Sequence, residues 1–337
     1  MTGKAAIPEL SGSQALASAE GPKKPVVVLA GPTASGKSTL ALALAQEFGG
    51  LVINADSMQI YRDLRILTAR PSIEDCQKVP HKLYGILDSA DPCSVGRWLT
   101  MAGQEIAAAH GAGRLPIVVG GTGLYLKALM EGISSIPDVP GPTREKATQL
   151  YDSLGGAAFK DRLVKRDPQT AERLPPTDRQ RLIRAWEVVE ATGRPLSDWH
   201  QAAGEGAPVG CDFIKCALLP PRPTLYAACD RRFGEMIERG ALAEVEALLA
   251  RNLDPALPVM KSLGVPELAL HLAGEVALPQ AVTKAQQKTR NYAKRQITWL
   301  RHQFIGNDNA SLVEFEQFSE RLRTIFFNKI RQRLLTS

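Results

Sequence analysis

The stretch that decides the fold is Val26-Val-Val-Leu-Ala30 followed by Gly31-Pro-Thr-Ala-Ser-Gly-Lys-Ser38. Its first part is a short, unbroken apolar run, which is typical of a buried parallel strand. The second part fits the pattern G-x-x-x-x-G-K-[ST] of a phosphate-binding P-loop, and a helical pattern runs through residues 37–47. A strand before the loop and a helix after it are the context that this pattern requires.

The chemistry of this loop predicts a site for an oligophosphate. Glycine lets the backbone curl so that consecutive N–H groups point inward, and the N-terminus of the helix adds partial positive charge. Lys37 adds a full positive charge, and the Ser38 hydroxyl is a candidate ligand for a Mg²⁺ ion that bridges phosphate oxygens. The pattern does not say which oligophosphate is bound or what happens to it.

Outside the loop, strand and helix patterns alternate. Residues 51–55 and 115–119 are further apolar runs, and a second helical pattern opens after residues 115–119. This order predicts an α/β fold, in which a P-loop core has a parallel sheet, flanking helices and sites at the carboxyl ends of its strands. Residues 142–208 have helical periodicity throughout, and the apolar run at residues 213–219 predicts a return to the sheet.

We therefore predict four parts along the chain. Residues 1–24, rich in Ala, Gly, Ser and Pro, form a disordered tail. Residues 25–141 and 212–308 form the P-loop core domain, and an all-helical insertion domain occupies residues 142–211 between them. Residues 309–337 form a loosely attached helical tail.

The composition is that of a globular protein, with 44% hydrophobic and 23% charged residues. The five cysteines include no C-x-x-C pair, which disfavours structural zinc and fits a reducing compartment. No apolar stretch approaches the roughly 20 residues that cross a bilayer, and the N-terminus does not resemble a secretory signal. We expect a cytoplasmic protein with no membrane partner. The net charge of +6 gives weak support for a polyanionic partner.

Asp56 follows the second predicted strand, so its carboxylate is expected beside the phosphate loop. Three interpretations are open at this point: a magnesium ligand, a general base, or an N-cap of the next helix. The third strand ends in Gly120-Gly-Thr122 and carries no carboxylate. Backbone N–H groups and the Thr122 hydroxyl would suit an anion or a leaving-group oxygen. The alternative is a tight turn with Thr122 as an N-cap.

Seven segments together resemble the tRNA dimethylallyltransferase family (adenosine isopentenyltransferases) in their order and rough spacing. They are Gly31 to Ser38, Asp56-Ser-Met-Gln-Ile-Tyr61, Val79-Pro-His81, Val119-Gly-Gly-Thr-Gly-Leu-Tyr125, Asp178-Arg-Gln-Arg-Leu-Ile-Arg-Ala185 with Glu187-Val188, Thr192-Gly-Arg-Pro-Leu-Ser197 and Thr289-Arg-Asn-Tyr-Ala-Lys-Arg-Gln-Ile-Thr-Trp299. The resemblance implies transfer of a dimethylallyl group from dimethylallyl diphosphate to the N6 amine of the adenosine beside the tRNA anticodon. No cysteine-histidine finger follows the core, so the resemblance is to the bacterial type.

The resemblance also implies roles for individual residues. Asp56 would be the base for the adenine amine, Thr122 would lie beside the reaction centre, and Mg²⁺ would lie near Ser38. The diphosphate would be bound by Gly31, Thr33, Ala34, Ser35, Gly36, Lys37, Ser38 and Arg232. The anticodon stem-loop of tRNA would contact Asp56, Ser57, Met58, Gln59 and Thr122 in the core, and Arg144, Gln180, Arg181, Leu182, Ile183 and Arg184 in the insertion.

The sequence departs from the family pattern in three places. Ala228 stands where the family has an arginine, Gly264-Val-Pro-Glu267 replaces a G-Y-K-E segment, and residues 65–70 differ from a more common G-T-A-K pattern. We interpret these changes as drift within the family.

Basic residues form two clusters that favour a phosphodiester partner. One cluster follows two stripes of a late helix, with Arg290, Lys294 and Arg301 on the first and Lys284, Lys288 and Arg295 on the second. The other contains Arg179, Arg181 and Arg184 in the insertion. A solvated charged face is the alternative for a single helix, but two clusters on either side of a phosphate loop favour RNA.

Two other functions share part of this pattern. A nucleoside or small-molecule kinase would have the same core, but it would need a carboxylate at the end of the third strand. A non-catalytic RNA-binding protein with a vestigial P-loop is disfavoured by the intact Lys37, Ser38 and Asp56. We expect a monomer, because nothing in the sequence indicates an obligate dimer.

Overall fold

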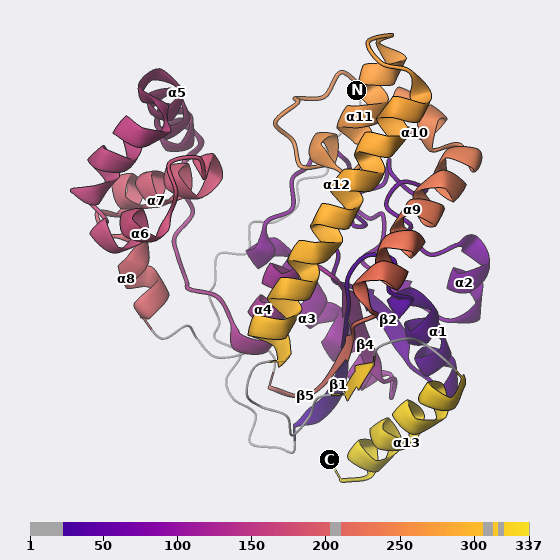
Figure 1. Cartoon of the computed structure of the whole chain (residues 1–337). Coiled ribbons are helices and arrows are strands. Elements are labelled where there is room, and N and C mark those ends of the chain that lie inside the picture. Colours follow the sequence, from indigo (N-terminus) through magenta and orange to yellow (C-terminus); the bar gives the residue numbers. More distant parts are fainter. Residues whose placement is uncertain (1–22, 203–209, 306–312, 316–319, 337) are drawn as a thin grey trace, which may run out of the picture.

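A computed structural model describes residues 23–202, 210–305, 313–315 and 320–336. Within these residues a parallel sheet has the strand order β3-β2-β4-β1-β5-β6, so the strand that precedes the P-loop lies inside the sheet (Figure 1). The strands are β1 (Lys24–Ala30), β2 (Leu51–Asn54), β3 (His81–Lys82), β4 (Pro116–Gly120), β5 (Cys211–Leu218) and β6 (Val313–Phe315). The predicted α/β class is confirmed.

The side chains of β1 alternate between two apolar layers, because successive residues of a strand face opposite sides of the sheet. Val27 and Leu29 pack in one layer with α1 (Lys37–Glu47) and α13 (Glu320–Thr336). Val26 and Val28 pack in the other with α3 (Val95–Gly111) and α4 (Gly123–Glu131). Both faces of β1 are therefore buried, which explains its unbroken apolar run.

A helical layer completes the second face of the core. Figure 1 shows α12 crossing the front of this layer, with α9, α10 and α11 beside it. The elements of this layer are α9 (Arg222–Glu238), α10 (Ala241–Ala250), η1 (Val259–Lys261), α11 (Val265–Leu272), α12 (Leu278–Trp299) and η2 (Leu300–Ile305). Helices α9 to α12 bring late parts of the chain to the carboxyl ends of the strands.

The short helix α2 (Ile73–Lys78) lies earlier in the chain. Its N-cap is Ser72, whose side chain accepts the Asp75 N–H.

The insertion is a separate helical lobe beside the core (Figure 1). Its helices are α5 (Gly141–Val164), α6 (Pro168–Arg173), α7 (Arg179–Thr192) and α8 (Leu196–Gln201). They enclose an apolar cluster of their own around Phe159, Leu163, Leu182 and Val188. Gly155, with φ of 74°, bends α5 in the middle.

Three expected boundaries need correction. Lys24 already belongs to β1 and pairs with Cys211, so residue 24 is not part of a tail and residue 211 is not part of the insertion. Residues 1–22, which make up most of the predicted disordered tail, lie outside the described residues. The predicted loose helical tail at residues 309–337 instead contributes β6 to the sheet, in parallel register with β5.

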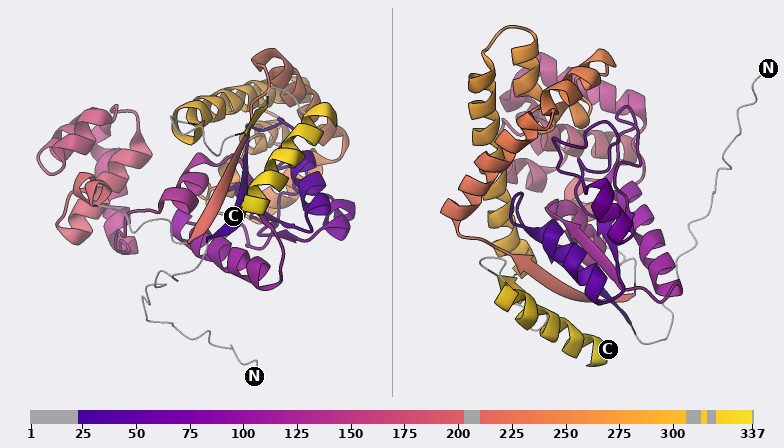
Figure 2. Two further views of the ribbon diagram at one scale, coloured as in Figure 1. Left: turned by 90° about the horizontal axis from the view of Figure 1, so that it is seen from below. Right: turned by 90° about the vertical axis from the view of Figure 1, so that its right-hand side faces the viewer.

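Helix α13 is the main part of this correction, because it packs against the core. Phe326 and Ile330 are fully buried in the layer that contains α1, and Phe327 stacks edge-on against Phe48 at 5.7 Å between ring centroids. Figure 2 shows α13 lying along the side of the core. Across the described residues, no helix is long and apolar enough to cross a membrane.

Candidate active site

The P-loop curls at the carboxyl end of β1, and its backbone geometry requires glycine at two positions. Gly36 has φ of 86°, a left-handed conformation that favours glycine, and it precedes α1. A Cβ on Gly31 would lie 2.7 Å from the Ser35 hydroxyl and 3.0 Å from the Leu218 carbonyl oxygen. The loop therefore forms only with glycine at these positions. Ser38 is exposed at the start of α1.

Two cations lie together at this loop. Lys37 donates to the Pro32 carbonyl oxygen at 3.2 Å, and the Arg232 guanidinium of α9 donates to the Thr33 hydroxyl. Burial lowers the pKa of Lys37 to about 8, although the nearby Asp56 carboxylate opposes this shift and Arg232 adds to it. Burial also lowers the pKa of Arg232. Two neighbouring positive charges in a partly buried site favour an anion with more than one negative charge.

Gln296 of α12 holds the P-loop from the other side. Its Oε1 accepts the Thr33 N–H at 2.8 Å, and its Nε2 donates to the Gly121 carbonyl oxygen at 2.9 Å. The buried carboxamide thus joins the phosphate loop to the loop after β4. A Cβ on Gly121 would lie 2.2 Å from the Gln296 Nε2, which explains the second glycine of the Gly-Gly-Thr turn.

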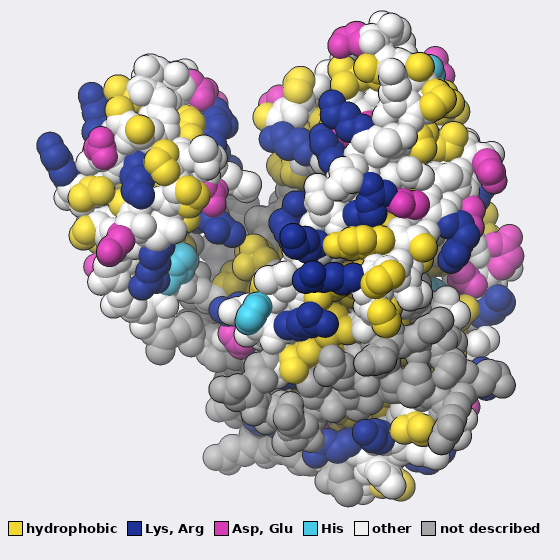
Figure 3. All heavy atoms as spheres, in the orientation of Figure 1, with side chains coloured by type: hydrophobic (Ala, Val, Ile, Leu, Met, Phe, Trp, Pro, Cys, Tyr) yellow, Lys and Arg dark blue, Asp and Glu magenta, His cyan; other side chains and the backbone are white. Residues whose placement is uncertain are grey.

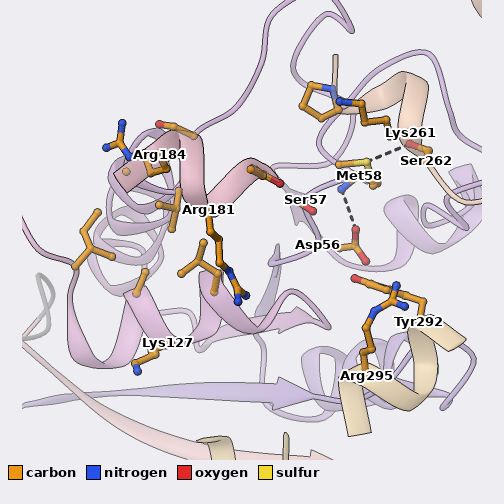
Figure 4. A pocket seen from close by; sticks show the side chains of 18 of the residues that line it. Asp56, Ser57, Met58, Lys127, Arg181, Arg184, Lys261, Ser262, Tyr292 and Arg295 are labelled. Atoms are coloured by element: carbon orange, nitrogen blue, oxygen red, sulfur yellow. Dashed lines mark hydrogen bonds between the residues drawn. The ribbon is translucent and has the colours of Figure 1, made fainter. Parts of the chain in front are cut away.

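Asp56 lies in a turn after β2. Its backbone N–H donates to Asn54 Oδ1 at 2.8 Å, and its own Oδ1 accepts the Met58 N–H at 2.9 Å. The next helix, α2, begins only at Ile73, so the N-cap interpretation of Asp56 is wrong. The other carboxylate oxygen has no hydrogen-bond partner among the described contacts, and Asp56 lines a large cleft (Figure 4).

Thr122 connects this turn to the loop after β4. Its Oγ1 accepts the Ser57 N–H at 3.0 Å, and it also lies 3.4 Å from the Ser57 hydroxyl. Thr122 precedes α4 but its side chain makes no capping bond, so the hydroxyl serves the site and not the helix end. A Cβ on Gly120 would lie 2.1 Å from the Ala55 carbonyl oxygen, so glycine permits this close approach of the two strand ends.

The cleft opens between the core and the insertion (Figure 3). Its volume is about 2160 Å³, larger than the roughly 300–1,000 Å³ of ordinary small-molecule pockets. Nine Lys and Arg residues line it against four Asp and Glu residues. The nine are Lys127, Arg144, Arg173, Arg179, Arg181, Arg184, Arg232, Lys261 and Arg295. Its size and charge suit a folded polyanion.

Five arginines of the insertion line this cleft, and a carboxylate organises two of them. Glu187, whose side chain is only 4% exposed, accepts from Arg144 Nε at 3.2 Å and from Arg184 Nη1 at 2.7 Å. Arg181 pairs with Asp178 at 3.4 Å and is 75% exposed. Figure 4 shows Arg181 and Arg184 across the cleft from Tyr292 and Arg295 of α12.

The expected tRNA contacts are not equally placed for that role. Gln180 and Ile183 line the cleft, as do Ser57 and Met58. Leu182 is fully buried in the apolar cluster of the insertion, so its side chain packs inside the lobe and our assignment of it to a tRNA contact is corrected. The Gln59 Nε2 donates to the Thr68 and Ala69 carbonyl oxygens and supports the neighbouring loop.

The basic stripes of α12 divide in a similar way. Arg295 faces the cleft, with its guanidinium 5.6 Å from the centroid of the Tyr292 ring. Lys288 forms an ion pair with the buried Glu267, and Arg290 pairs with Asp230 at 2.5 Å. Lys288 and Arg290 therefore also stabilise the packing of the helices.

Sequence reasoning missed three residues that organise the site: Gln296, Tyr292 and Glu187. Tyr292 and Gln296 are one helical turn apart on α12, and both belong to the segment from Thr289 to Trp299. Their i, i+4 spacing was a signal that they share one face of the helix. Glu187 was a buried acid in an amphipathic helix next to arginines, but sequence alone does not show its burial.

The fold and the site together define a P-loop α/β protein that places an oligophosphate site beside a large basic cleft. The family model described as IPP transferase matches residues 59–303, and the model described as isopentenyl transferase matches residues 24–85. The chain belongs to the IPP transferase family.

Curated relatives carry a consistent name. A tRNA dimethylallyltransferase of Rhodospirillum centenum is 56% identical over 84% of this chain and 90% of the relative. A tRNA dimethylallyltransferase of Paramagnetospirillum magneticum is 54% identical over 93% of this chain and 98% of the relative.

Solved structures agree in fold. The full-length tRNA isopentenylpyrophosphate transferase of Bacillus halodurans is 31% identical, with a TM-score of 0.66 over 93% of this chain and 97% of that one. A eukaryotic dimethylallyltransferase described as acting on tRNA is 30% identical, with a TM-score of 0.73 over 86% of this chain and 74% of that one.

Proposed function

We propose that this protein transfers the dimethylallyl group of dimethylallyl diphosphate to the N6 amine of the adenosine 3′-adjacent to the anticodon of tRNA. The products are N6-isopentenyladenosine and diphosphate. The observation that carries the proposal is that one cleft holds the P-loop residue Thr33, its partner Arg232 and the unpaired edge of Asp56 between a basic core and a basic insertion. Family membership supports the same reaction.

The chemistry assigns a separate task to each side of the cleft. The exocyclic amine of adenine is a weak nucleophile, because its lone pair is delocalised into the ring. The allylic carbon becomes electrophilic as its bond to the diphosphate oxygen breaks. Lys37, Arg232 and the P-loop N–H groups stabilise the departing charge, and the nitrogen forms the new bond to carbon. Asp56 takes the proton that the amine loses.

The adenine must flip out of the anticodon loop to reach this site. An adenine in a stacked anticodon loop cannot reach the end of a deep cleft, so the base must leave its stack. Arg144, Arg181 and Arg184 would hold the phosphodiester backbone from the insertion, while Ser57 and Met58 contact the extruded base.

Magnesium fits the donors that this site offers. Among the described residues, no group of three or more His, Cys, Asp and Glu side chains could hold a metal ion. Ser38 supplies one exposed hydroxyl beside Lys37, and Mg²⁺ commonly takes its remaining ligands from phosphate oxygens and water. A bound Mg²⁺ would neutralise charge on the diphosphate.

The kinase alternative is disfavoured by the end of β4. A kinase of this core needs a carboxylate there for its metal, but β4 ends at Gly120, which packs on the Ala55 carbonyl. The relatives are also named as tRNA dimethylallyltransferase and tRNA isopentenylpyrophosphate transferase, and not as kinases.

The reaction is tested by transfer of labelled dimethylallyl from its diphosphate to unmodified tRNA with Mg²⁺, next to an ATP-hydrolysis control. Asp56→Asn keeps an oxygen that can accept the Met58 N–H but is a poor base. We expect it to bind tRNA normally and to lose about 10²–10⁴-fold in rate. ATP consumption without label in tRNA would overturn the proposal in favour of a kinase.

We propose further that the protein acts as a cytoplasmic monomer. The support for a monomer is that the core and the insertion of a single chain already enclose a cleft with the P-loop residue Thr33, Asp56 and the basic residues. Light scattering on the free protein and its tRNA complex tests the oligomeric state, and fractionation of cells tests the compartment.

A further inference from the structure

Tyr292 occupies the part of α12 that faces the reacting end of the cleft. It lines the cleft with Thr289, one turn before Gln296, which binds the P-loop at Thr33. Residues at i and i+4 share a helix face, so the same face of α12 carries the P-loop anchor and the tyrosine. The Arg295 guanidinium lies over the ring, 5.6 Å from its centroid.

The phenol group of Tyr292 points toward the Asp56 carboxylate, as Figure 4 shows. The Thr122 side chain lies near the same phenol, because Thr122 and Asp56 both affect the pKa of Tyr292. Burial raises the pKa of Tyr292, and the negative charge of Asp56 raises it further. The hydroxyl therefore keeps its proton at neutral pH and is a donor beside a carboxylate.

Asp56 needs such a donor to act as a directional base. Its Oδ1 is held by the Met58 N–H at 2.9 Å, which fixes one oxygen but leaves the plane of the carboxylate free to turn about that bond. A second donor would fix the plane and aim the remaining lone pairs into the cleft. Thr122 accepts the Ser57 N–H at 3.0 Å, so the turn that carries Asp56 is itself held in place beside the phenol.

We propose that Tyr292 is a positioning residue for the transfer reaction: its hydroxyl, which points toward Asp56 without bonding to it in this structure, donates a hydrogen bond to that carboxylate during the reaction and orients it toward the adenine amine. This inference rests on the proposed function. It concerns the hydroxyl and not the ring, so a variant that removes only the oxygen tests it.

The experiment compares Tyr292→Phe with Tyr151→Phe in the full chain. Tyr151 donates its hydroxyl to the Pro176 carbonyl oxygen inside the insertion, so it controls for loss of a bonded phenol away from Asp56. Thermal melts of both variants check folding. We expect Tyr292→Phe to lower kcat about tenfold with both KM values within about twofold, and Tyr151→Phe to leave kcat unchanged.

A double-mutant cycle then separates positioning from an independent role. If Tyr292 acts through Asp56, adding Tyr292→Phe to Asp56→Asn should cost little or nothing further. An equal loss in both backgrounds, an unchanged kcat in Tyr292→Phe, or a change confined to KM would overturn the proposal. A parent chain that transfers no label would instead reject the reaction itself.

Discussion

Gln296 Oε1 accepts the backbone N–H of Thr33 at 2.8 Å, although 263 positions separate the two residues in the chain. The carboxamide also donates to Gly121, so it fixes the P-loop against the turn that carries Thr122. The geometry of the phosphate loop therefore depends on a helix near the other end of the sequence.

Replacing Gln296 with Ala should weaken the phosphate site and the fold together. The change leaves the buried Gly121 carbonyl oxygen without its partner, at a cost of about 1–3 kcal/mol, and it removes the acceptor of the partly buried Thr33 N–H at a smaller cost. We expect a lower melting temperature and a higher KM for dimethylallyl diphosphate. Gln287→Ala, on the exposed face of the same helix, is the control and should change neither quantity. Equal behaviour of the two variants would argue against the anchor.

The lowered pKa of Lys37 predicts how diphosphate binding depends on pH. Above about pH 8 the free loop loses this charge, so affinity for inorganic diphosphate should fall by up to about tenfold per pH unit. Bound anion raises the pKa again, so binding should take up a proton in this range. Calorimetric titrations in two buffers of different ionisation enthalpy measure both effects, and Lys37→Arg should flatten them. Affinity that stays constant through this range would contradict the assignment.

The same pKa has a consequence for stability. The folded protein binds the Lys37 proton less tightly than the unfolded chain, so between about pH 8 and the ordinary lysine value of 10.5 the unfolded state holds more protons. Stability of the ligand-free protein therefore gains from this group as pH rises through that window. Lys37→Met should be at least as stable as the parent below pH 8 and should bind no diphosphate, which melts with and without diphosphate would reveal.

Glu187 predicts a defect that affects tRNA and not the small substrate. Glu187→Gln removes the charge that orients Arg144 and Arg184, so we expect the KM for tRNA to rise about tenfold, or roughly 1.4 kcal/mol. The KM for dimethylallyl diphosphate should not change. Two freed guanidinium groups should also make RNA binding more salt-dependent.

The control for this variant lies on the same helix. Glu190→Gln breaks the pair with Arg166, and neither Glu190 nor Arg166 lines the cleft. Its tRNA affinity and salt dependence should match those of the parent. If both variants bind tRNA equally well, the two arginines do not depend on Glu187.

Phe326→Ala tests whether α13 belongs to the core. Phe326 is fully buried against the layer of α1, so truncating it should lower the free energy of unfolding by about 3–5 kcal/mol. Ile325→Ala on the exposed side of α13 is the control. Denaturant titrations measure both, and transfer activity of the folded fraction should be unaffected because α13 lies away from the cleft. A decrease in the free energy of unfolding of less than about 1 kcal/mol would indicate that α13 is only loosely attached to the core.

The P-loop, its strand and the return of the sheet at β5 were predictable from sequence, because each is a local pattern of apolar periodicity and glycine spacing. The residues expected at the site came mainly from family resemblance, and the roles assigned to most of them stay predictions. Family resemblance does not assign every residue correctly. Leu182 belongs to a segment that resembles a tRNA-contact segment of the family, but its side chain packs inside the insertion.

Long-range partners were not predictable in the same way. Gln296 with Thr33, and Glu187 with Arg144, are pairs that only the folded chain brings together. The short strand β6 was missed because it has only three residues, and α13 was predicted as a helix but not as part of the core, because it is rich in charge along its exposed side. Their stability comes from packing against β5 and α1, which local propensity does not report.

The position of β1 between β4 and β5 has a consequence for the order of folding during synthesis. Its partner β5 begins at Cys211, beyond the whole insertion, and β5 in turn pairs with β6 at residues 313–315. The strand that leads into the phosphate loop must therefore wait, half unpaired, while most of the chain leaves the ribosome. Such late, long-range closure is slow and leaves an apolar strand edge exposed to aggregation. The helical insertion, which has an apolar cluster of its own, leaves the ribosome complete while the core still lacks β5.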